Sequence, residues 1–434
     1  MNATVSALGD DIRRHIAGVY DQIESLYRQL HRYPELPFQE HKTSARLADE
    51  LEALGYEVTR NVGRTGVVAL LRNGDGPTVM LRTDMDALPI KECTDLEFAS
   101  QEVAENASGE SVPVMHACGH DLHSSCLVGA AAVLINLRDR WSGTLMLICQ
   151  PAEEIFGGAQ AMLDDGLYQR FPRPDVVLGQ HNMPALAGTV GHNGGQAMAA
   201  ATTLGVTVHG VGGHGSAPSR SIDPVVIAAH IVTRLQSIVS REVPPEQTAV
   251  VTVGKLHAGH QGNVIPNHAE LEINVRSFDN ALHQRIIDSI RRIVEAECLA
   301  GRSPQPPEFT VLSETITLDN DGSATERVKA AHAGFFGADK LFAMPRVSGS
   351  EDFPYFGNAK AGGFGGDDIP YVYWFVGSVD PQRWQQLPGD SAGEKLAHAH
   401  GPHSPHYTPG CRGTFETGIA TLAVAALGYL GNDA

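Results

Sequence analysis

The chain lacks an excess of basic residues. It has 32 lysines and arginines against 50 aspartates and glutamates, which gives a formal net charge of −18 over 434 residues. Nucleic acids and anionic membranes attract positively charged surfaces, so this balance argues against both as partners. The composition favours an enzyme that acts on small molecules.

The sequence also lacks a cysteine framework and an apolar leader. Residues 1–20 contain Asp10, Asp11, Arg13 and Arg14 and no long apolar run, so we expect neither a signal peptide nor a membrane anchor. The six cysteines are scattered without regular spacing, at positions 93, 118, 126, 149, 298 and 411. This scatter favours reduced thiols over disulfides, and we expect a cytoplasmic protein.

No internal repeat or low-complexity tract is present, and the length exceeds what one hydrophobic core ordinarily holds, so we expect two domains. In the first domain, apolar runs alternate with helical segments. The runs lie at residues 67–71, 78–81, 144–149 and 176–178, and the helical segments at 8–30, 40–54 and 122–137. This alternation predicts an α/β fold with a mostly parallel sheet. We assign this catalytic domain to residues 1–194 and 316–434.

Between residues 195 and 315 the pattern changes to the order β-α-β-β-α-β. We expect strands at 202–209, 249–256, 269–275 and 309–312 and helices at 224–240 and 281–299. Asp223 and Pro224 suit the start of the first helix, as an N-cap acid followed by a proline. The order fits a small ferredoxin-like α+β domain, inserted into the first as a lid or dimerisation domain.

The segment from Met115 to His123 is rich in metal-binding side chains. Cys118 and His120 flank Gly119, so their side chains point to the same side of an extended segment and can share a metal ion. Further on, successive side chains diverge in the pair Glu153-Glu154. One carboxylate can therefore hold a metal while the other takes a proton from water.

Each of these residues also has an ordinary structural explanation. A lone cysteine is usually a small buried hydrophobe, and a glutamate pair is usually a solvated helix face. We interpret Asp121 as the N-cap of the helix over 122–137. Soft and borderline ligands beside paired acids are a rare combination, however, and together they favour a metal site.

The positions of the polar residues agree with this interpretation. Asp84 and Asp86 follow the second predicted strand, the pair at 153–154 follows the third, and His181 follows the fourth. In parallel sheets, ligands bind beyond the carboxyl ends of the strands. The candidates therefore belong to one edge of the predicted sheet.

A series of short motifs runs in order over nearly the whole chain, at residues 31–36, 84–89, 115–123, 151–154, 157–158, 179–181, 213–218, 263–266, 350–353 and 403–405. With these motifs the chain resembles the amidohydrolase branch of the two-metal aminoacylase and carboxypeptidase superfamily. That branch includes hippurate hydrolases, indole-acetyl-amino-acid hydrolases and N-acyl-amino-acid amidohydrolases.

The resemblance implies that two divalent ions, zinc or manganese, are held by Cys118, His120, Glu154, His181 and His403. It implies that Glu153 is the general acid and base. The residues alone indicate that Cys118, His120 and the glutamate pair form the metal site. The resemblance adds His181 as a ligand, and it adds His403, which spacing could not select.

Three further residues hold supporting positions. Asp86 is expected to orient a ligand, although a turn or capping role would leave the same pattern. His31 and Glu35 are expected to tie down the N-terminal region. His116 and His123 stay among the histidines with no ligand role.

The resemblance also assigns residues of the inserted domain. It implies that His214 stabilises the oxyanion, often across a dimer interface, where the alternative is a tolerated loop histidine. Asn263 and Arg276 hold positions associated with substrate contact, and an arginine suits a free carboxylate. We expect a homodimer or a tetramer. The Gly-rich run at 362–366 and the His-rich loop before His403 depart from the family pattern. They leave the proposed metal ligands unchanged, but the family pattern does not determine the residues of the substrate pocket.

The resulting hypothesis is a two-metal amidohydrolase that cleaves the amide of an N-acyl or N-aroyl amino acid into a carboxylic acid and an amino acid. One alternative is a dipeptidase or carboxypeptidase of the same fold. Another is a binding or metal-storage protein without catalysis. Glu153 argues against storage, because storage needs no acid beside the ligands.

Overall fold

The computed structural model describes residues 8–431, which fall into two compact units. The first unit holds the described residues up to Gly195, Asp319–Pro345 and the described residues from Asp352 on, and the second holds Gln196–Leu318 and Arg346–Glu351. We expected residues 316–318 and 346–351 in the first domain and Gly195 in the second, whereas each belongs to the other unit. The backbone joins residues 346–351 to the second unit, because Met198 bridges Val347 and the Ala199 N–H donates to the Gly349 carbonyl at 2.9 Å.

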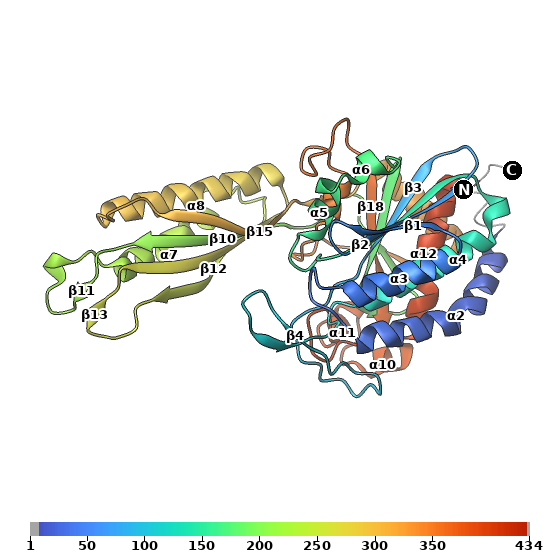
Figure 1. Ribbon diagram of the computed structural model, residues 1–434, viewed down its shortest axis with the longest axis horizontal. Helices are drawn as coiled ribbons and strands as arrows, with labels where there is room; N and C mark the ends of the chain where they lie inside the picture. Colours follow the sequence, from blue (N-terminus) through green and yellow to red (C-terminus); the bar gives the residue numbers. More distant parts are fainter. Residues whose placement is uncertain (1–7, 432–434) are drawn as a thin grey trace. The chain divides into compact units, whose positions relative to one another are not determined.

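The first unit is built on an eight-stranded sheet of order β1-β2-β6-β3-β7-β18-β8-β17 (Figure 1). The strands are β1 (Glu57–Val62), β2 (Gly66–Asn73), β3 (Thr78–Asp84), β6 (Gly143–Gln150), β7 (Val176–Leu186), β8 (Val190–His192), β17 (Leu341–Ala343) and β18 (Tyr371–Val379). The four central strands, β6, β3, β7 and β18, run parallel to their neighbours in that group. The antiparallel pairs are β1 with β2, β2 with β6, and β18 with β8. The prediction of an α/β fold with a mostly parallel sheet is confirmed.

Long helices cover this sheet, and two of them are buried on nearly all sides. The helices are α2 (Gly9–Arg32), α3 (His41–Ala53), α4 (His120–Asn136), α9 (Gly322–Phe336) and α12 (Arg412–Leu430). Residues 120–134 of α4 are all buried, and α4 packs on both α2 and α12. α12 is long and apolar enough to cross a membrane, but 83% of its apolar window is buried inside the protein. A helix that is apolar on all sides is typical of a protein core as well as of a membrane span.

The chain also has shorter helices and strands. They are α5 (Gly158–Asp164), α6 (Leu167–Arg170), α10 (Pro381–Gln386), α11 (Ala392–Leu396), β4 (Val103–Glu105), β5 (Ser111–Pro113), β9 (Gln196–Met198) and β16 (Leu318–Asp319). The described residues also form four 3₁₀ turns, η1 (Arg138–Arg140), η2 (Pro218–Arg220), η3 (Ala338–Lys340) and η4 (Phe353–Phe356). Of these shorter elements, β9 and η2 lie in the second unit. α11 lies within the His-rich loop that precedes His403, so this loop has helical structure of its own.

The second unit has a four-stranded antiparallel sheet of order β12-β14-β10-β15. Its elements are β10 (Ala200–His209), α7 (Pro224–Arg241), β12 (Ala249–Ala258), β14 (His268–Ser277), α8 (Asn280–Ala300) and β15 (Glu308–Thr315). Alternate strand residues and the apolar faces of α7 and α8 form one core. As predicted, Asp223 caps α7, because its carboxylate accepts from the Val225 N–H at 2.9 Å. A separate two-stranded sheet pairs β11 (Gly213–His214) with β13 (Val264–Ile265).

Candidate metal centre

The candidate residues come from the ends of neighbouring elements of the first unit. β3 ends at Asp84 and β6 ends at Gln150, directly before the loop that carries the two glutamates, whereas His181 lies within β7. Gly119 precedes α4 with a φ of +85°. A Cβ at this position would lie 2.5 Å from Asn182 Nδ2, so the tight turn beside Cys118 needs glycine, as the sequence indicated.

All five proposed ligands and Glu153 converge. Cys118 Sγ lies 3.4 Å from His181 Nε2, and Glu154 Oε2 lies 3.3 Å from His403 Nε2. His120 Nε2 lies 3.8 Å from Glu153 Oε2. The potential ligand atoms form overlapping groups in which all atoms lie within 4.8 Å of one another: Cys118, His120 and His181; Cys118, Glu154 and His403; His120, Glu153 and Glu154.

His403 reaches this cluster from a loop. Its backbone N–H donates to the Ala117 carbonyl at 2.7 Å, directly beside Cys118. Its φ is +67°, which is uncommon for a residue with a side chain. This long-range backbone contact places His403, and nothing in its local sequence announces it.

The donor set fits divalent cations. His120 Nδ1 is 3.1 Å from Asp86 Oδ1, whereas His120 Nε2 is buried without a hydrogen-bond partner, and so is Glu154 Oε1. These two atoms are 3.9 Å apart, too far for a hydrogen bond. A bound cation would satisfy both atoms.

The electrostatics of the cluster support the same conclusion. Burial raises the pKa of the Cys118 thiol well above its usual range, and the carboxylates of Glu154 and Glu153 raise it further. Burial opposes a charged His120, but the carboxylates of Asp84 and Asp86 outweigh it and raise the pKa of this histidine to about 10. Without cations the cluster therefore keeps protons on Cys118 and His120, and a metal would have to displace them.

The sequence matches Peptidase family M20/M25/M40 over residues 80–377. The chain belongs to this family. A hippurate hydrolase of Campylobacter jejuni subsp. jejuni is 38% identical over 347 residues, which cover 80% of this chain and 87% of the relative. Thermostable carboxypeptidase 1 of Saccharolobus solfataricus is 34% identical over 393 residues, which cover 89% of this chain and 93% of the relative.

A solved structure of a Bacillus subtilis protein, described as a dinuclear metal binding peptidase from the M20 family, is similar with a TM-score of 0.72 and 28% sequence identity. The similarity covers 95% of this chain and 100% of that protein. This M20 chain is therefore an enzyme, a metal-dependent amidohydrolase, and the resemblance seen in its motifs is confirmed.

Asp86 links two of the proposed ligands of this M20 protein. One of its carboxylate oxygens contacts His120 Nδ1, and the other accepts from the Glu154 N–H at 3.0 Å. A carboxylate behind a histidine fixes the ring and directs its other nitrogen at a metal. The contacts are those expected of a residue that orients a ligand.

A buried group that the sequence analysis missed lies beside it. Arg82 is 1% exposed, and its Nη1 donates to Asp84 Oδ2 at 2.7 Å. The other oxygen of Asp84 is 2.7 Å from His123 Nδ1, and His123 Nε2 accepts from the Asn182 N–H at 2.9 Å. Both ring nitrogens of His123 thus have partners within the protein. An arginine inside an otherwise apolar strand was the available signal, because a buried arginine needs a carboxylate.

The prediction that Asp121 is a helix cap is wrong. α4 begins two residues earlier than expected, at His120, with Gly119 at the N-cap position. Asp121 Oδ2 instead contacts His31 Nδ1 at 2.7 Å, and His31 Nε2 contacts Glu92 Oε1 at 3.0 Å. The left-handed glycine turns the chain into the helix early and leaves Asp121 facing α2. His31 thereby ties down the N-terminal helix, as expected.

Glu35 has the same anchoring role at the next helix. Its carboxylate oxygens accept from the Lys42 N–H at 3.1 Å and the Thr43 N–H at 2.8 Å. Both N–H groups lie in the first turn of α3, where the helix itself offers no acceptor for them. The expectation that Glu35 holds the N-terminal region agrees with these contacts.

The three remaining predicted residues belong to the second unit. His214 is exposed and contacts Ser216 Oγ through Nδ1 at 2.7 Å, and the Asn263 carbonyl accepts from the Gly215 N–H at 2.8 Å. His214 and Asn263 are therefore neighbours. Arg276 lies near the end of β14, where its Nη1 donates to the Ser348 carbonyl at 2.6 Å.

Arg276 is remote from the other two within the second unit. β14 begins at His268, close to β13, and Arg276 stands near its other end. At about 3.3 Å per residue, the strand carries Arg276 roughly 26 Å away from that end. One copy of this unit does not bring Arg276 and His214 to the same small molecule.

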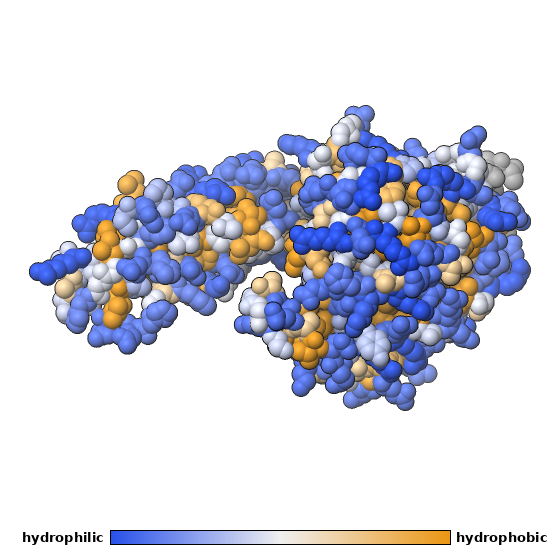
Figure 2. All heavy atoms as spheres, viewed as in Figure 1, coloured by the Kyte–Doolittle hydropathy of each residue, from blue (hydrophilic) through white to orange (hydrophobic). Residues whose placement is uncertain are grey.

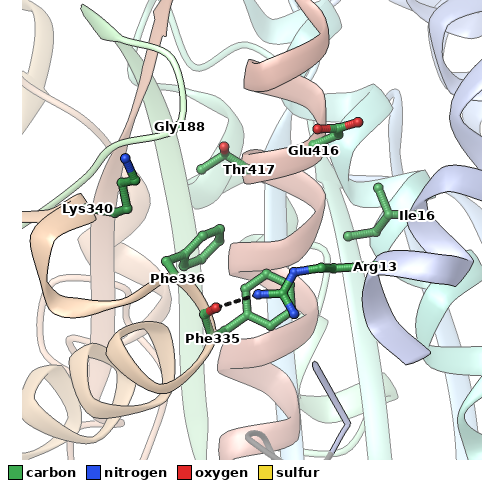
Figure 3. Close-up of a pocket in the computed structure, with 8 residues that line it drawn as sticks. All are labelled: Arg13, Ile16, Gly188, Phe335, Phe336, Lys340, Glu416 and Thr417. Carbon is green, nitrogen blue, oxygen red and sulfur yellow. Dashed lines mark hydrogen bonds between the residues drawn. The ribbon is translucent and has the colours of Figure 1, made fainter. Parts of the chain in front are cut away.

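A cavity elsewhere in the first unit has a different character (Figure 3). It has a volume of about 400 Å³ and is lined by Arg13, Ile16, Gly188, Phe335, Phe336, Lys340, Glu416 and Thr417, none of which is a candidate ligand. The guanidinium of Arg13 stacks on the Phe335 ring and donates to the Phe335 carbonyl at 2.8 Å. Its main cation thus already has partners, and the metal centre remains the better candidate for catalysis.

Proposed function

We propose that the protein hydrolyses the amide bond of N-acyl or N-aroyl amino acids and releases a carboxylic acid and an amino acid. The observation that carries this proposal is the placement of Glu153 beside the unpartnered Nε2 of His120, within a cluster that already has enough other ligands. The substrate class is supported by the relative named for hippurate, an N-aroyl amino acid.

Two divalent ions would be held by Cys118, His120, Glu154, His181 and His403, and their Lewis acidity would make water a better nucleophile and polarise the amide carbonyl. Glu153 takes a proton from the attacking water and returns it to the nitrogen of the leaving amine, so the amide bond breaks without a charged amine anion. Asp86 keeps His120 and Glu154 in place. We propose zinc or manganese, and the thiol and imidazole donors favour zinc.

We also propose that the protein works as a homodimer, or as a tetramer built from two such dimers, with the second unit as a ferredoxin-like dimerisation and lid domain. His214 and Asn263 would serve the site of the partner, and Arg276 would bind the free carboxylate of the substrate. The separation of roughly 26 Å between Arg276 and the start of β14 supports sharing between chains. Apolar side chains exposed on the second unit support an interface there, among them Val226, Val250, Val264, Leu299 and Leu312. Apolar atoms on the surface of this unit are visible in Figure 2.

A substrate panel tests the reaction. N-acetyl, N-benzoyl and indole-acetyl amino acids, their C-terminal amides and a set of dipeptides would be supplied to protein of known metal content. We expect turnover of N-acyl amino acids and at least about tenfold lower kcat/KM for the amides, because Arg276 would lose its charged partner. A clear preference for dipeptides would favour the peptidase alternative, which the thermostable carboxypeptidase relative supports.

Complementation tests the sharing of sites. Glu153→Gln and His214→Ala homodimers should each be nearly inactive. After subunit exchange, a mixed dimer contains one site with both residues intact, and activity should return. If mass spectrometry confirms exchange and no activity appears, His214 does not serve the partner.

A further inference from the structure

Glu153 sits on a tight loop whose backbone is held in an unusual conformation. Ala152, the residue before it, has a φ of +48°, and Phe156 has a φ of +54°. Residues with a Cβ avoid this left-handed region unless their surroundings hold them there. The Gly157 and Gly158 N–H groups both donate to the Ala152 carbonyl at 3.1 Å. Ala152 is thus the centre of the loop that presents Glu153.

A buried carboxylate holds Ala152 from the other side. Glu40 is fully buried, and its Oε1 accepts from the Ala152 N–H at 2.9 Å and from the Phe38 N–H at 2.8 Å. Phe38 is also left-handed, with a φ of +61°. The second oxygen of Glu40 accepts from Thr65 Oγ1 at 2.6 Å. One carboxylate oxygen therefore stabilises two strained residues, and the Thr65 contact fixes that carboxylate.

Two other carboxylates hold this loop and the start of α5, the helix that follows it. Asp86 accepts from the Glu154 N–H at 3.0 Å, and Asp352 accepts from the Ala159 N–H at 3.0 Å. Asp86 also contacts the proposed ligand His120, so a change there would disturb the metals directly. Glu40 contacts Ala152, the residue before Glu153. Its hydrogen bonds with Ala152, Phe38 and Thr65 involve no proposed ligand.

We propose that Glu40 is a positioning residue for Glu153: its carboxylate holds Ala152 in the left-handed conformation and so directs the Glu153 side chain toward the attacking water. The inference rests on the proposed role of Glu153. The contact between Glu40 and Ala152 is long-range, since it joins residues that are 112 positions apart in the sequence.

The first test is backbone hydrogen exchange, which needs no substrate. In Glu40→Ala, a peptide that spans residues 150–158 should exchange at least about tenfold faster than in the wild type, because the Ala152 N–H loses its acceptor. The matched control is Glu35→Ala, which removes a carboxylate that also binds backbone N–H groups, but at α3. The control should leave this peptide unchanged. Equal exchange in Glu40→Ala and wild type would overturn the proposal.

The second test is kinetic. Glu40→Ala should lower kcat roughly tenfold to a hundredfold, with KM and metal content unchanged, as for supporting residues of other sites. Glycine adopts the left-handed conformation readily. Adding Ala152→Gly to Glu40→Ala should therefore restore kcat by about fivefold, a gain that no repair of packing around Glu40 would produce. Glu40→Gln keeps an Oε1 acceptor and should stay close to the wild-type kcat.

Glu40→Asp covers the case in which Glu40→Ala fails to fold. Aspartate keeps the charge but is one methylene shorter, so it should lose the Ala152 contact and show the same exchange and rescue. A loss of kcat that Ala152→Gly does not repair, or a loss of metal from these variants, would overturn the proposal. If the wild type hydrolyses no N-acyl amino acid, the proposed function fails, and the exchange measurement still decides the role of Glu40.

Discussion

Two buried histidines of the first unit start from the same chemistry. His31 and His120 are both 0% exposed, and each directs Nδ1 at an aspartate: His31 at Asp121 over 2.7 Å and His120 at Asp86 over 3.1 Å. Burial opposes the charge on both rings, but neighbouring carboxylates raise the pKa of His31 to about 9 and that of His120 to about 10.

The two differ at the second ring nitrogen. His31 Nε2 contacts Glu92 Oε1 at 3.0 Å, so every polar atom of this ring has a partner. His120 Nε2 has no hydrogen-bond partner among the described residues, and the nearest oxygens of Glu153 and Glu154 stand 3.8 and 3.9 Å away. A satisfied buried ring holds the fold together, whereas an unsatisfied one beside several carboxylates needs a cation.

Metal removal should separate the two regions most strongly. Chelation should reduce turnover to background, and zinc, manganese or cobalt should restore it. The reason is that the two buried atoms of the cluster without a hydrogen-bond partner, His120 Nε2 and Glu154 Oε1, need a cation. Turnover and metal content by mass spectrometry check this. His120→Gln should lose metal, whereas His31→Gln should keep the wild-type metal content. Full activity in thoroughly stripped protein would end the metal assignment.

The acid pair should divide in the same manner. Glu153→Gln should lower kcat by roughly two to four orders of magnitude and keep both ions, since it removes proton transfer and leaves the ligands. Glu154→Gln should lower metal occupancy, because Glu154 lies beside both His120 and His403. Metal analysis beside initial rates gives the answer. A reversal of these two phenotypes would reverse the roles assigned to the pair.

The region around His31 should affect stability instead. His31→Gln should lower the free energy of unfolding by roughly 3 kcal/mol, because two buried carboxylates lose a charged partner. The folded pKa of His31, about 9, exceeds its unfolded value, so its contribution is fully present below pH 6.5 and is lost as the pH rises through 9. Urea unfolding at pH 6.5 and 10 should show a large difference from wild type at the lower pH and a small one at the higher. An equal difference at both values would contradict an ionic role.

Proton competition should distinguish the metal centre more gently. Because the empty cluster keeps protons on Cys118 and His120, the apparent affinity for zinc should fall at least about tenfold for each unit of pH decrease between 8 and 6. Competition with a chelator of known affinity measures it. A pH-independent affinity would mean that the metal displaces no proton.

Local chemistry predicted the elements of this protein well. The apolar runs and helical segments match strands and helices because each depends on neighbours a few residues away, and Asp223 caps α7 for the same reason. The pair of Cys118 and His120 could also be read locally, since Gly119 lets both meet one site. The prediction for Asp121 failed, because the left-handed Gly119 starts α4 early and leaves the Asp121 carboxylate to contact His31, which lies on a distant helix.

The rest was decided by contacts between distant segments. The sequence by itself determined which donor types are present, where the strands end and which residues flank Gly119. Only the tertiary structure decided that the His403 N–H donates to the Ala117 carbonyl, which brings His403 beside Cys118. It also decided that the Glu40 carboxylate accepts from the Ala152 N–H. Whether a buried donor or acceptor is satisfied depends on partners far along the chain, and this satisfaction separates an anchoring histidine from a metal ligand.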